Sequence, residues 1–146
     1  DAQFVIVGEM PSYPGWYSCY PLCLAKSLVF PRVKLLKNLT RAEVTAAYRA
    51  ADLFLFGSEI ECAPLVMYEA FAAKTALITR PVGNVKDHAE FLKITETPEA
   101  MARVAGELLD NAEARKALTE PAFRRWKENY RWEQLADKYE LLFKRL

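Results

Sequence analysis

Cysteine and histidine are scarce in this chain of 146 residues, which has three cysteines and a single histidine. Cys19, Cys23 and Cys62 are too few and too irregularly spaced for a disulfide scaffold, which favours a cytoplasmic protein. Cys19 and Cys23 could share one helical face, but no second ligand pair accompanies them and His88 stands alone. The sequence therefore predicts no metal site, and small packed residues are the better interpretation of the two cysteines.

The chain also lacks an excess of charge, a long hydrophobic run and a low-complexity linker. Its 20 basic and 19 acidic side chains give a net charge of +1, and nothing in this balance calls for a nucleic acid as partner. No apolar run reaches the length of a membrane span, and the first residues are not those of a signal peptide. We expect one cytoplasmic domain with a single core.

Short apolar strands alternate with helical segments along the first two thirds of the chain. Strands are predicted at residues 3–7, 33–36, 53–56, 76–79 and 91–94, and helices at residues 20–29, from residue 40 and at 64–74. Thr40 and Glu43 have the T-x-x-E spacing of a capping box at the start of the second helix. The alternation is typical of right-handed βαβ units. The predicted fold class is α/β, with a Rossmann-like parallel sheet of about five strands, helices on both faces and a helical C-terminal segment.

The last third of the chain has a helical pattern throughout. Pro98 suits a helix start, a shorter helix is expected at residues 112–118, Pro121 is expected to open another, and Trp132 begins the last. We expect residues 97–146 to be the helical part of one lobe that comprises residues 1–146. The β-branched run at residues 3–7 is typical of a central strand with neighbours on both sides. We therefore expect the chain to be part of a longer protein.

The most informative motif is the run SEIECAPLVMYEAFAAKT, in which Glu61 and Glu69 lie eight positions apart with Pro64 between them. Proline is preferred at a first helical position, so a helix is predicted to begin at Pro64. The unpaired N–H groups of a first turn and the positive end of the helix dipole together favour an anion, above all a phosphate. The motif therefore predicts a phosphate-binding helix end with one carboxylate on each side of it.

Those carboxylates indicate which phosphate compound the helix end would suit. A carboxylate beside a diphosphate is repulsive unless it binds something else, and an ionised carboxylate accepts hydrogen bonds from the two hydroxyls of a diol. A molecule with a diphosphate in its middle and hydroxyls on both sides is a nucleotide sugar. The predicted ligand is thus a nucleotide diphosphate sugar, the donor in sugar transfer.

Residues 33–84 resemble the donor-binding core of the group 1 family of retaining, two-lobed (GT-B fold) glycosyltransferases. That core has a strand, a loop with small residues and serine, a glutamate, seven residues and a second glutamate that opens an EA helix. The corresponding residues here are Ser58, Glu61, Pro64, Leu65, Glu69, Ala70 and Ala72, and the later segment TRPVGN resembles the next strand and glycine turn of the family.

The resemblance implies a role for each matched position. Glu61, the candidate catalytic residue, would contact the donor sugar, and Glu69 would hold the ribose diol. The remaining predicted binding residues are the backbone amides of Cys62, Ala63, Leu65 and Val66 at the sugar and diphosphate, Asn38 near the nucleobase, and Gly83 close to the donor. No cofactor and no metal are implied. Further implied partners are an N-terminal lobe of the same protein and a glycan or lipid-linked acceptor. The implied location is the cytoplasm, with the protein peripheral to the inner face of the membrane.

The chain departs from the family in a few places. Lys37, Lys74 and Asn84 replace frequent glycines, which is typical of some branches. No pair here matches the diphosphate-binding arginine and lysine, which lie upstream in the family together with the acceptor lobe, so this chain alone is not expected to catalyse transfer. The alternative function is a non-catalytic Rossmann-like binding or interaction module. A third possibility, an epimerase of similar two-lobed build, would need a catalytic acid or base, and none stands out in this sequence. His88 is expected to have a surface or packing role, and Gly8 to be a turn.

Overall fold

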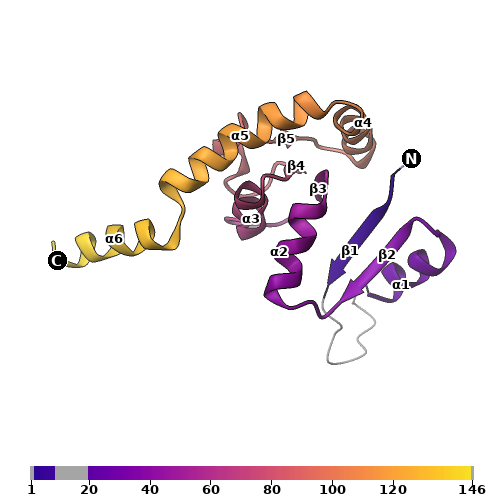
Figure 1. Cartoon of the computed structure of the whole chain (residues 1–146), viewed down its shortest axis with the longest axis horizontal. Coiled ribbons are helices and arrows are strands. Elements are labelled where there is room, and N and C mark those ends of the chain that lie inside the picture. Colours follow the sequence, from indigo (N-terminus) through magenta and orange to yellow (C-terminus); the bar gives the residue numbers. More distant parts are fainter. Residues whose placement is uncertain (1, 9–19, 146) are drawn as a thin grey trace. The chain divides into compact units, whose positions relative to one another are not determined.

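A computed structural model describes residues 2–8 and 20–145, and the chain divides into two compact units, Asp1–Ala46 and Ala47–Leu146 (Figure 1). We call them the N-terminal unit and the C-terminal unit. The predicted packing of Cys19 falls outside the described residues.

The N-terminal unit is a small parallel βαβ arrangement. It contains β1 (Phe4–Gly8), α1 (Tyr20–Val29), β2 (Val33–Lys37) and the start of α2 (Arg41–Ala50). β1 and β2 pair in parallel from Phe4 beside Val33 to Gly8 beside Lys37. The capping box is confirmed, because the Thr40 N–H donates to Glu43 Oε2 at 2.7 Å and the Glu43 N–H donates to Thr40 Oγ1 at 3.3 Å.

The C-terminal unit is a three-stranded parallel sheet packed with helices. Its strands are β3 (Leu53–Phe56), β4 (Ala76–Thr79) and β5 (Lys93–Ile94), in the order β3-β4-β5. Its helices are α3 (Leu65–Ala73), the 3-10 helix η1 (Val85–His88), α4 (Pro98–Leu109), α5 (Ala112–Asn129) and α6 (Trp132–Phe143). The sheet lies among α3, α4 and α5 in Figure 1.

Both faces of this sheet are covered, as the alternation of side chains on β4 shows. Leu77 and Ile78 are consecutive residues and therefore point to opposite faces. On one side the buried cluster is Met67, Ala70, Phe71, Leu77, Val82, Val85, Leu92 and Ala122, with Phe54 and Phe56 packed against it. On the other it is Ile78, Ala105, Leu108 and Leu118, with Leu53 packed against it. Thus α3 covers one face and α4 covers the other, while α5 contributes to both clusters.

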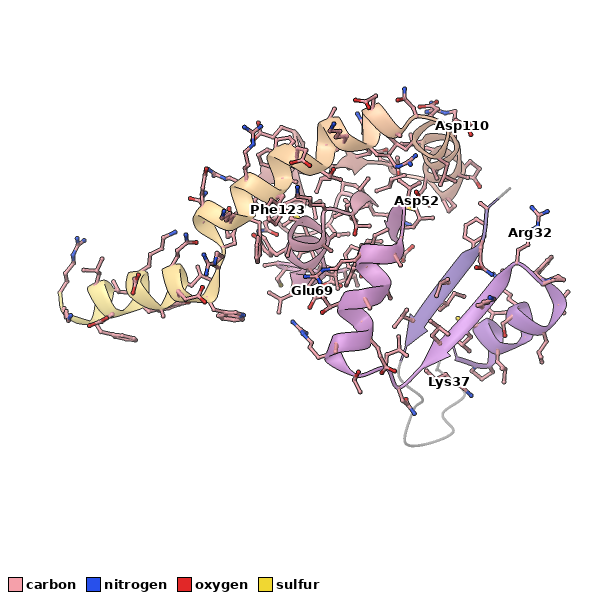
Figure 2. All side chains as sticks on the ribbon, in the orientation of Figure 1. Arg32, Lys37, Asp52, Glu69, Asp110 and Phe123 are labelled. Carbon is pink, nitrogen blue, oxygen red and sulfur yellow. The ribbon has the colours of Figure 1, made fainter. Side chains whose placement is uncertain are left out.

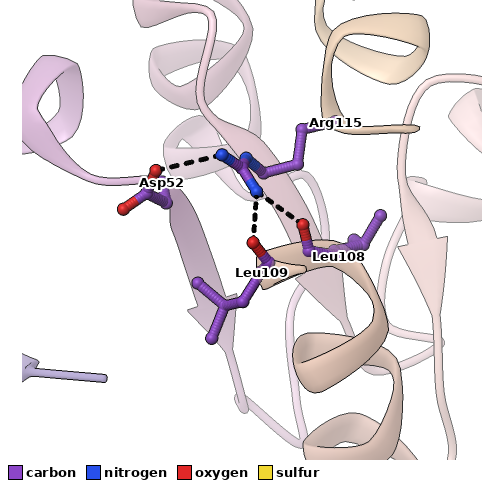
Figure 3. A network of polar contacts seen from close by, with 4 residues as sticks. All are labelled: Asp52, Leu108, Leu109 and Arg115. Atoms are coloured by element: carbon purple, nitrogen blue, oxygen red, sulfur yellow. Dashed lines mark hydrogen bonds and ion pairs between the residues drawn. The ribbon is translucent and has the colours of Figure 1, made fainter. Parts of the chain in front are cut away.

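Arg115 fastens the end of α4 to the start of β3 (Figure 3). One terminal nitrogen, Nη1, donates to the carbonyl oxygens of Leu108 at 2.6 Å and Leu109 at 2.8 Å, and the other, Nη2, pairs with Asp52 Oδ1 at 3.3 Å. The last carbonyls of a helix have no intrahelical donor, and a cation there also interacts favourably with the helix dipole. Arg115 therefore closes the end of α4 and fixes it beside β3.

The predicted fold class is confirmed, with two corrections. The five described strands form one sheet of two and one of three, rather than a single sheet. The predicted break at Pro121 is wrong, because α5 runs through it from Ala112 to Asn129. A proline inside a helix removes one N–H, but the buried side chains of Leu118, Thr119 and Ala122 hold this stretch of α5 against the core.

The last helix, α6, begins at Trp132 as predicted and buries none of its residues. Its exposed apolar side chains include Trp132, Tyr139, Leu141, Leu142 and Phe143. Within residues 2–8 and 20–145, no helix combines the length and the apolar character that crossing a lipid bilayer requires.

Candidate functional site

The N-terminus of α3 is built one residue later than predicted. Pro64 has φ −67° and ψ 113°, which is extended backbone, so it is the N-cap rather than the first helical residue. Its carbonyl accepts from the Met67 N–H at 3.2 Å, and Pro64 itself is buried. In a helix that begins at Leu65, the N–H groups of Leu65 and Val66 precede the first intrahelical donor. The correction leaves these two amides at the helix tip, where the dipole favours an anion.

Glu61 lies in the loop between β3 and α3 and is held by its own loop. The Ser58 hydroxyl donates to Glu61 Oε1 at 3.0 Å, and Glu61 is half-buried. The neighbouring Glu59 is paired instead with Arg80 at 3.0 Å, beyond the end of β4. The loop therefore separates its acids, one in an ion pair and the other, Glu61, turned toward the serine.

Glu69 is the fifth residue of α3, marked in Figure 2, and is half-buried. It lies one and a half turns from the helix tip, and helical side chains lean toward the N-terminus. Glu61 and Glu69 thus come from the loop and the helix that meet at Pro64.

The structure brings Cys62 and Gly83 together. Gly83 has φ 51°, and a Cβ added to it would overlap the carbonyl of Cys62 and lie 3.1 Å from the Glu61 carbonyl oxygen. The following residue, Asn84, donates its N–H to the Cys62 carbonyl at 3.0 Å. The left-handed backbone favours glycine here, and the close approach to the Cys62 carbonyl requires it. The backbones of Cys62 and Gly83, both predicted binding residues, are therefore in contact with each other. The next residue after Cys62, Ala63, is exposed.

Asn38, the residue predicted near the nucleobase, belongs to the N-terminal unit. It follows β2 directly, has φ 51° and donates its N–H to the Gly8 carbonyl at 3.2 Å. Asparagine tolerates this left-handed conformation better than most residues. Asn38 thus forms a turn at the carboxyl end of a parallel strand, where ligands of α/β proteins bind.

Lys74 replaces a frequent family glycine at the end of α3. Its φ of 59° is left-handed, and the Thr75 N–H closes the helix on the Ala70 carbonyl at 2.9 Å. A lysine there has a backbone cost that glycine avoids. Its ammonium group in turn pairs with Glu120 at 2.9 Å and lies 4.7 Å from the centre of the Phe123 ring, contacts that glycine could not make.

Three residues behind the loop, Tyr68, Asn84 and His88, are connected by polar contacts. Asn84 Nδ2 donates to the Tyr68 hydroxyl at 3.2 Å, and that hydroxyl lies 3.3 Å from His88 Nε2. Burial lowers the pKa of His88 and raises the pKa of Tyr68, so both are held neutral. Of the surface and packing roles expected for His88, the structure shows packing, since the residue is only 4% exposed. Asn84 and His88 each stand out in the sequence, but nothing in their spacing indicates that they meet Tyr68.

Neither of the two described cysteines, Cys23 and Cys62, is in a disulfide. Cys23 is half-buried and Cys62 is exposed. Among the described residues, no three His, Cys, Asp or Glu side chains come together in a way that could hold a metal ion. The polar groups of the site are therefore the two glutamates, Ser58 and backbone amides.

A family model for group 1 glycosyl transferases matches residues 1–111. The chain belongs to this family. A curated relative, the D-inositol 3-phosphate glycosyltransferase of Salinispora tropica, is 33% identical in an alignment of 141 residues that covers 92% of this chain and 29% of the relative. The chain therefore spans less than a third of that relative's length.

Solved structures show the same fold. Sucrose-phosphate synthase from Thermosynechococcus elongatus matches 99% of this chain and 39% of its own chain with a TM-score of 0.77 and 20% identity. The HepE protein of Anabaena in complex with UDP matches 99% of this chain and 41% of its own with a TM-score of 0.82 and 13% identity. The family and Rossmann-like fold predicted from the sequence are both confirmed.

Proposed function

We propose that this chain is the donor-binding lobe of a glycosyltransferase that transfers a sugar from a nucleoside diphosphate sugar to a hydroxyl acceptor. Family membership supports the reaction class, and the likeness to a UDP complex supports the type of donor. The short coverage of longer relatives supports a single lobe, residues 1–146, that works with an N-terminal lobe of the same protein. Its C-terminal helical part comprises residues 97–146.

The observation that carries this proposal is the loop and helix around Pro64. The diphosphate is proposed to bind at the tip of α3, where the N–H groups of Leu65 and Val66 are available together with those of Cys62 and Ala63. Preorganised donors at this point would stabilise the negative charge that develops on the departing diphosphate. Pro64 has no N–H, so it shapes the loop without contributing a donor.

The two glutamates are proposed to bind hydroxyls on either side of the diphosphate. Glu61, which Ser58 orients at 3.0 Å, is the candidate catalytic residue at the donor sugar. Glu69 on α3 would accept from the ribose diol. Asn38 is proposed for the nucleobase and Gly83 for close approach to the donor. The resemblance also implies transfer with retention of anomeric configuration and a glycan or lipid-linked acceptor at the inner face of the membrane.

Titration calorimetry of the full-length protein with UDP, GDP and ADP tests the proposal. We expect at least one diphosphate to bind, and Glu69→Gln to weaken it about 10- to 100-fold, because a hydrogen bond to a charged group contributes about 1.5–3 kcal/mol. Glu128→Gln, an exposed acid on α5, is the matched control and should bind as the parent does. Binding of none of the three, or an equal affinity in Glu69→Gln, would contradict the proposal.

A further inference from the structure

A line of polar contacts runs from the core of the C-terminal unit to the loop that carries Glu61. It begins at His88 Nε2, passes through the Tyr68 hydroxyl at 3.3 Å and the Asn84 side chain at 3.2 Å, and ends where the Asn84 N–H meets the Cys62 carbonyl at 3.0 Å. These three side chains come from α3, from the turn after Gly83 and from η1. The line therefore connects the motif helix with the glycine turn and the loop.

The direction of the hydrogen bonds follows from which groups can donate. The Asn84 amide nitrogen can only donate, so it occupies a lone pair of the Tyr68 oxygen. Burial keeps the His88 imidazole neutral, so its Nε2 either accepts the phenol hydrogen or donates to the phenol oxygen, according to which ring nitrogen carries the proton. Every contact in the line thus has one donor and one acceptor.

Aromatic packing fixes the middle of the line. The Tyr68 ring lies 4.6 Å from the Tyr130 ring and 5.6 Å from the His88 ring, measured between centroids, and His88 also meets Phe71 edge-on at 6.0 Å. Rings packed at these distances have little rotational freedom. The Tyr68 hydroxyl is therefore held at a defined position for Asn84.

The far end of the line determines the orientation of one peptide bond. The Cys62 carbonyl and the Ala63 N–H belong to the same peptide unit, and no described peptide is cis. In a planar trans peptide these two groups point in opposite directions. Since the Asn84 N–H holds the Cys62 carbonyl toward the glycine turn, the Ala63 N–H is directed away from that turn. Cys62 and Ala63, the two residues of this peptide, are exposed.

We propose that Tyr68, Asn84 and His88 are positioning residues that orient the Ala63 N–H toward the diphosphate or sugar of the donor. This inference rests on the proposed function, because it assigns a task within the same site. None of the three is proposed to touch the donor through its side chain. Gly83 completes the arrangement, since a side chain there would displace the Cys62 carbonyl that Asn84 holds.

The test compares hydroxyl deletions on neighbouring tyrosines in the full-length protein. Tyr68→Phe removes the central hydroxyl and keeps the ring, whereas Tyr130→Phe removes a hydroxyl from the same aromatic cluster that takes no part in the line. We expect Tyr68→Phe to weaken binding of the tightest of UDP, GDP and ADP about tenfold, and Tyr130→Phe to leave it unchanged. This inference alone would be overturned if Tyr68→Phe and Tyr130→Phe bound the diphosphate equally well while Glu69→Gln weakened binding relative to the parent protein. A parent that binds no diphosphate would overturn the proposed function and this inference with it.

Substitutions at His88 provide a second measurement. His88→Gln keeps a hydrogen-bonding group near the Nε2 position, whereas His88→Phe keeps a ring and removes that group. We expect the Ala63 amide resonance to shift in ligand-free His88→Phe and Tyr68→Phe, and to remain near its parent position in His88→Gln. This readout reports the peptide orientation without a ligand. An Ala63 amide that is unmoved in both ring variants would contradict the positioning role even if affinity fell.

Discussion

The two units of the chain use similar apolar strands in opposite ways. In the C-terminal unit, Leu77 on β4 is 1% exposed and forms part of the core that covers one face of the sheet. In the N-terminal unit, Phe4 on β1 is 53% exposed, and no side chain described within residues 2–8 and 21–46 is buried. Strand and helix formation depends on local sequence, whereas burial requires covering elements from elsewhere in the chain or its partners. Stability in this chain should therefore be concentrated in the C-terminal unit.

Truncation of one phenylalanine in each unit, Phe71 on α3 and Phe4 on β1, should give the largest difference between the units. Phe71→Ala removes a fully buried ring and should lower the free energy of unfolding by about 3–5 kcal/mol. Phe4→Ala should cost less than about 1 kcal/mol, because its ring is already half in water. Urea denaturation followed by circular dichroism measures both. Similar losses in the two variants would show that β1 is buried in solution and would remove the contrast.

Alanine at two glycines of the C-terminal unit should change stability with opposite signs. Gly83→Ala should destabilise by about 3 kcal/mol, because it adds left-handed strain and forces the Cys62 carbonyl aside. Gly106 lies inside α4, and a Cβ there meets nothing within 4 Å, so Gly106→Ala should stabilise by about 0.5–1 kcal/mol. Thermal unfolding of both variants checks the signs, and a neutral Gly83→Ala would contradict the close approach.

Removing an arginine that closes a helix end should cost more unfolding free energy than removing one that forms only an exposed ion pair. Arg115→Ala removes the Nη1 donor from the Leu108 and Leu109 carbonyls, of which Leu108 keeps the Asn111 N–H, and should cost about 2 kcal/mol. Arg103→Ala loses only an exposed pair with Glu107 and should cost less than about 0.5 kcal/mol. Chemical denaturation of the two variants compares them, and equal costs would mean that Arg115 does not hold the end of α4.

Buried His88 should give the smallest effect, a dependence of stability on pH. Burial lowers its pKa from the ordinary value of 6.5, so below that value the unfolded chain binds a proton that the folded chain does not. Its contribution is complete above pH 6.5 and is lost as the pH falls from there toward the folded pKa. The pKa values of Glu43 and Glu120 are lowered from 4.5, so their contributions are lost at lower pH still. Denaturation between about pH 5 and 7.5 should show a slope that His88→Gln removes, and a persistent slope would assign it to another group.

Much of the fold could be predicted because it follows from local pattern. The bounds of β3, β4 and α1 are those expected, and the capping box at Thr40 forms as its spacing indicates. The errors at Pro64 and Pro121 have one cause. Proline signals a helix boundary locally, but the surrounding structure decides whether it caps the helix, as Pro64 does, or lies inside it, as Pro121 does.

Part of the candidate site could likewise be predicted from local sequence, and part of it could not. Glu61, Pro64 and Glu69 are visible in the sequence because they are close along the chain. The contacts of Tyr68 with Asn84 and His88 join residues that are 16 and 20 positions apart, and no spacing rule predicts which distant side chains meet. The close approach of Gly83 to the Cys62 carbonyl could not be predicted from the sequence either, although the sequence did single out the glycine.

Hydrogen–deuterium exchange of the full-length protein, with and without the nucleoside diphosphate that binds tightest, tests the central claim most directly. If the tip of α3 receives the diphosphate, exchange should slow at the amides of Cys62, Ala63, Leu65 and Val66, while α6 remains unchanged. Binding that protects other segments and leaves those four amides exchanging at their ligand-free rates would contradict it.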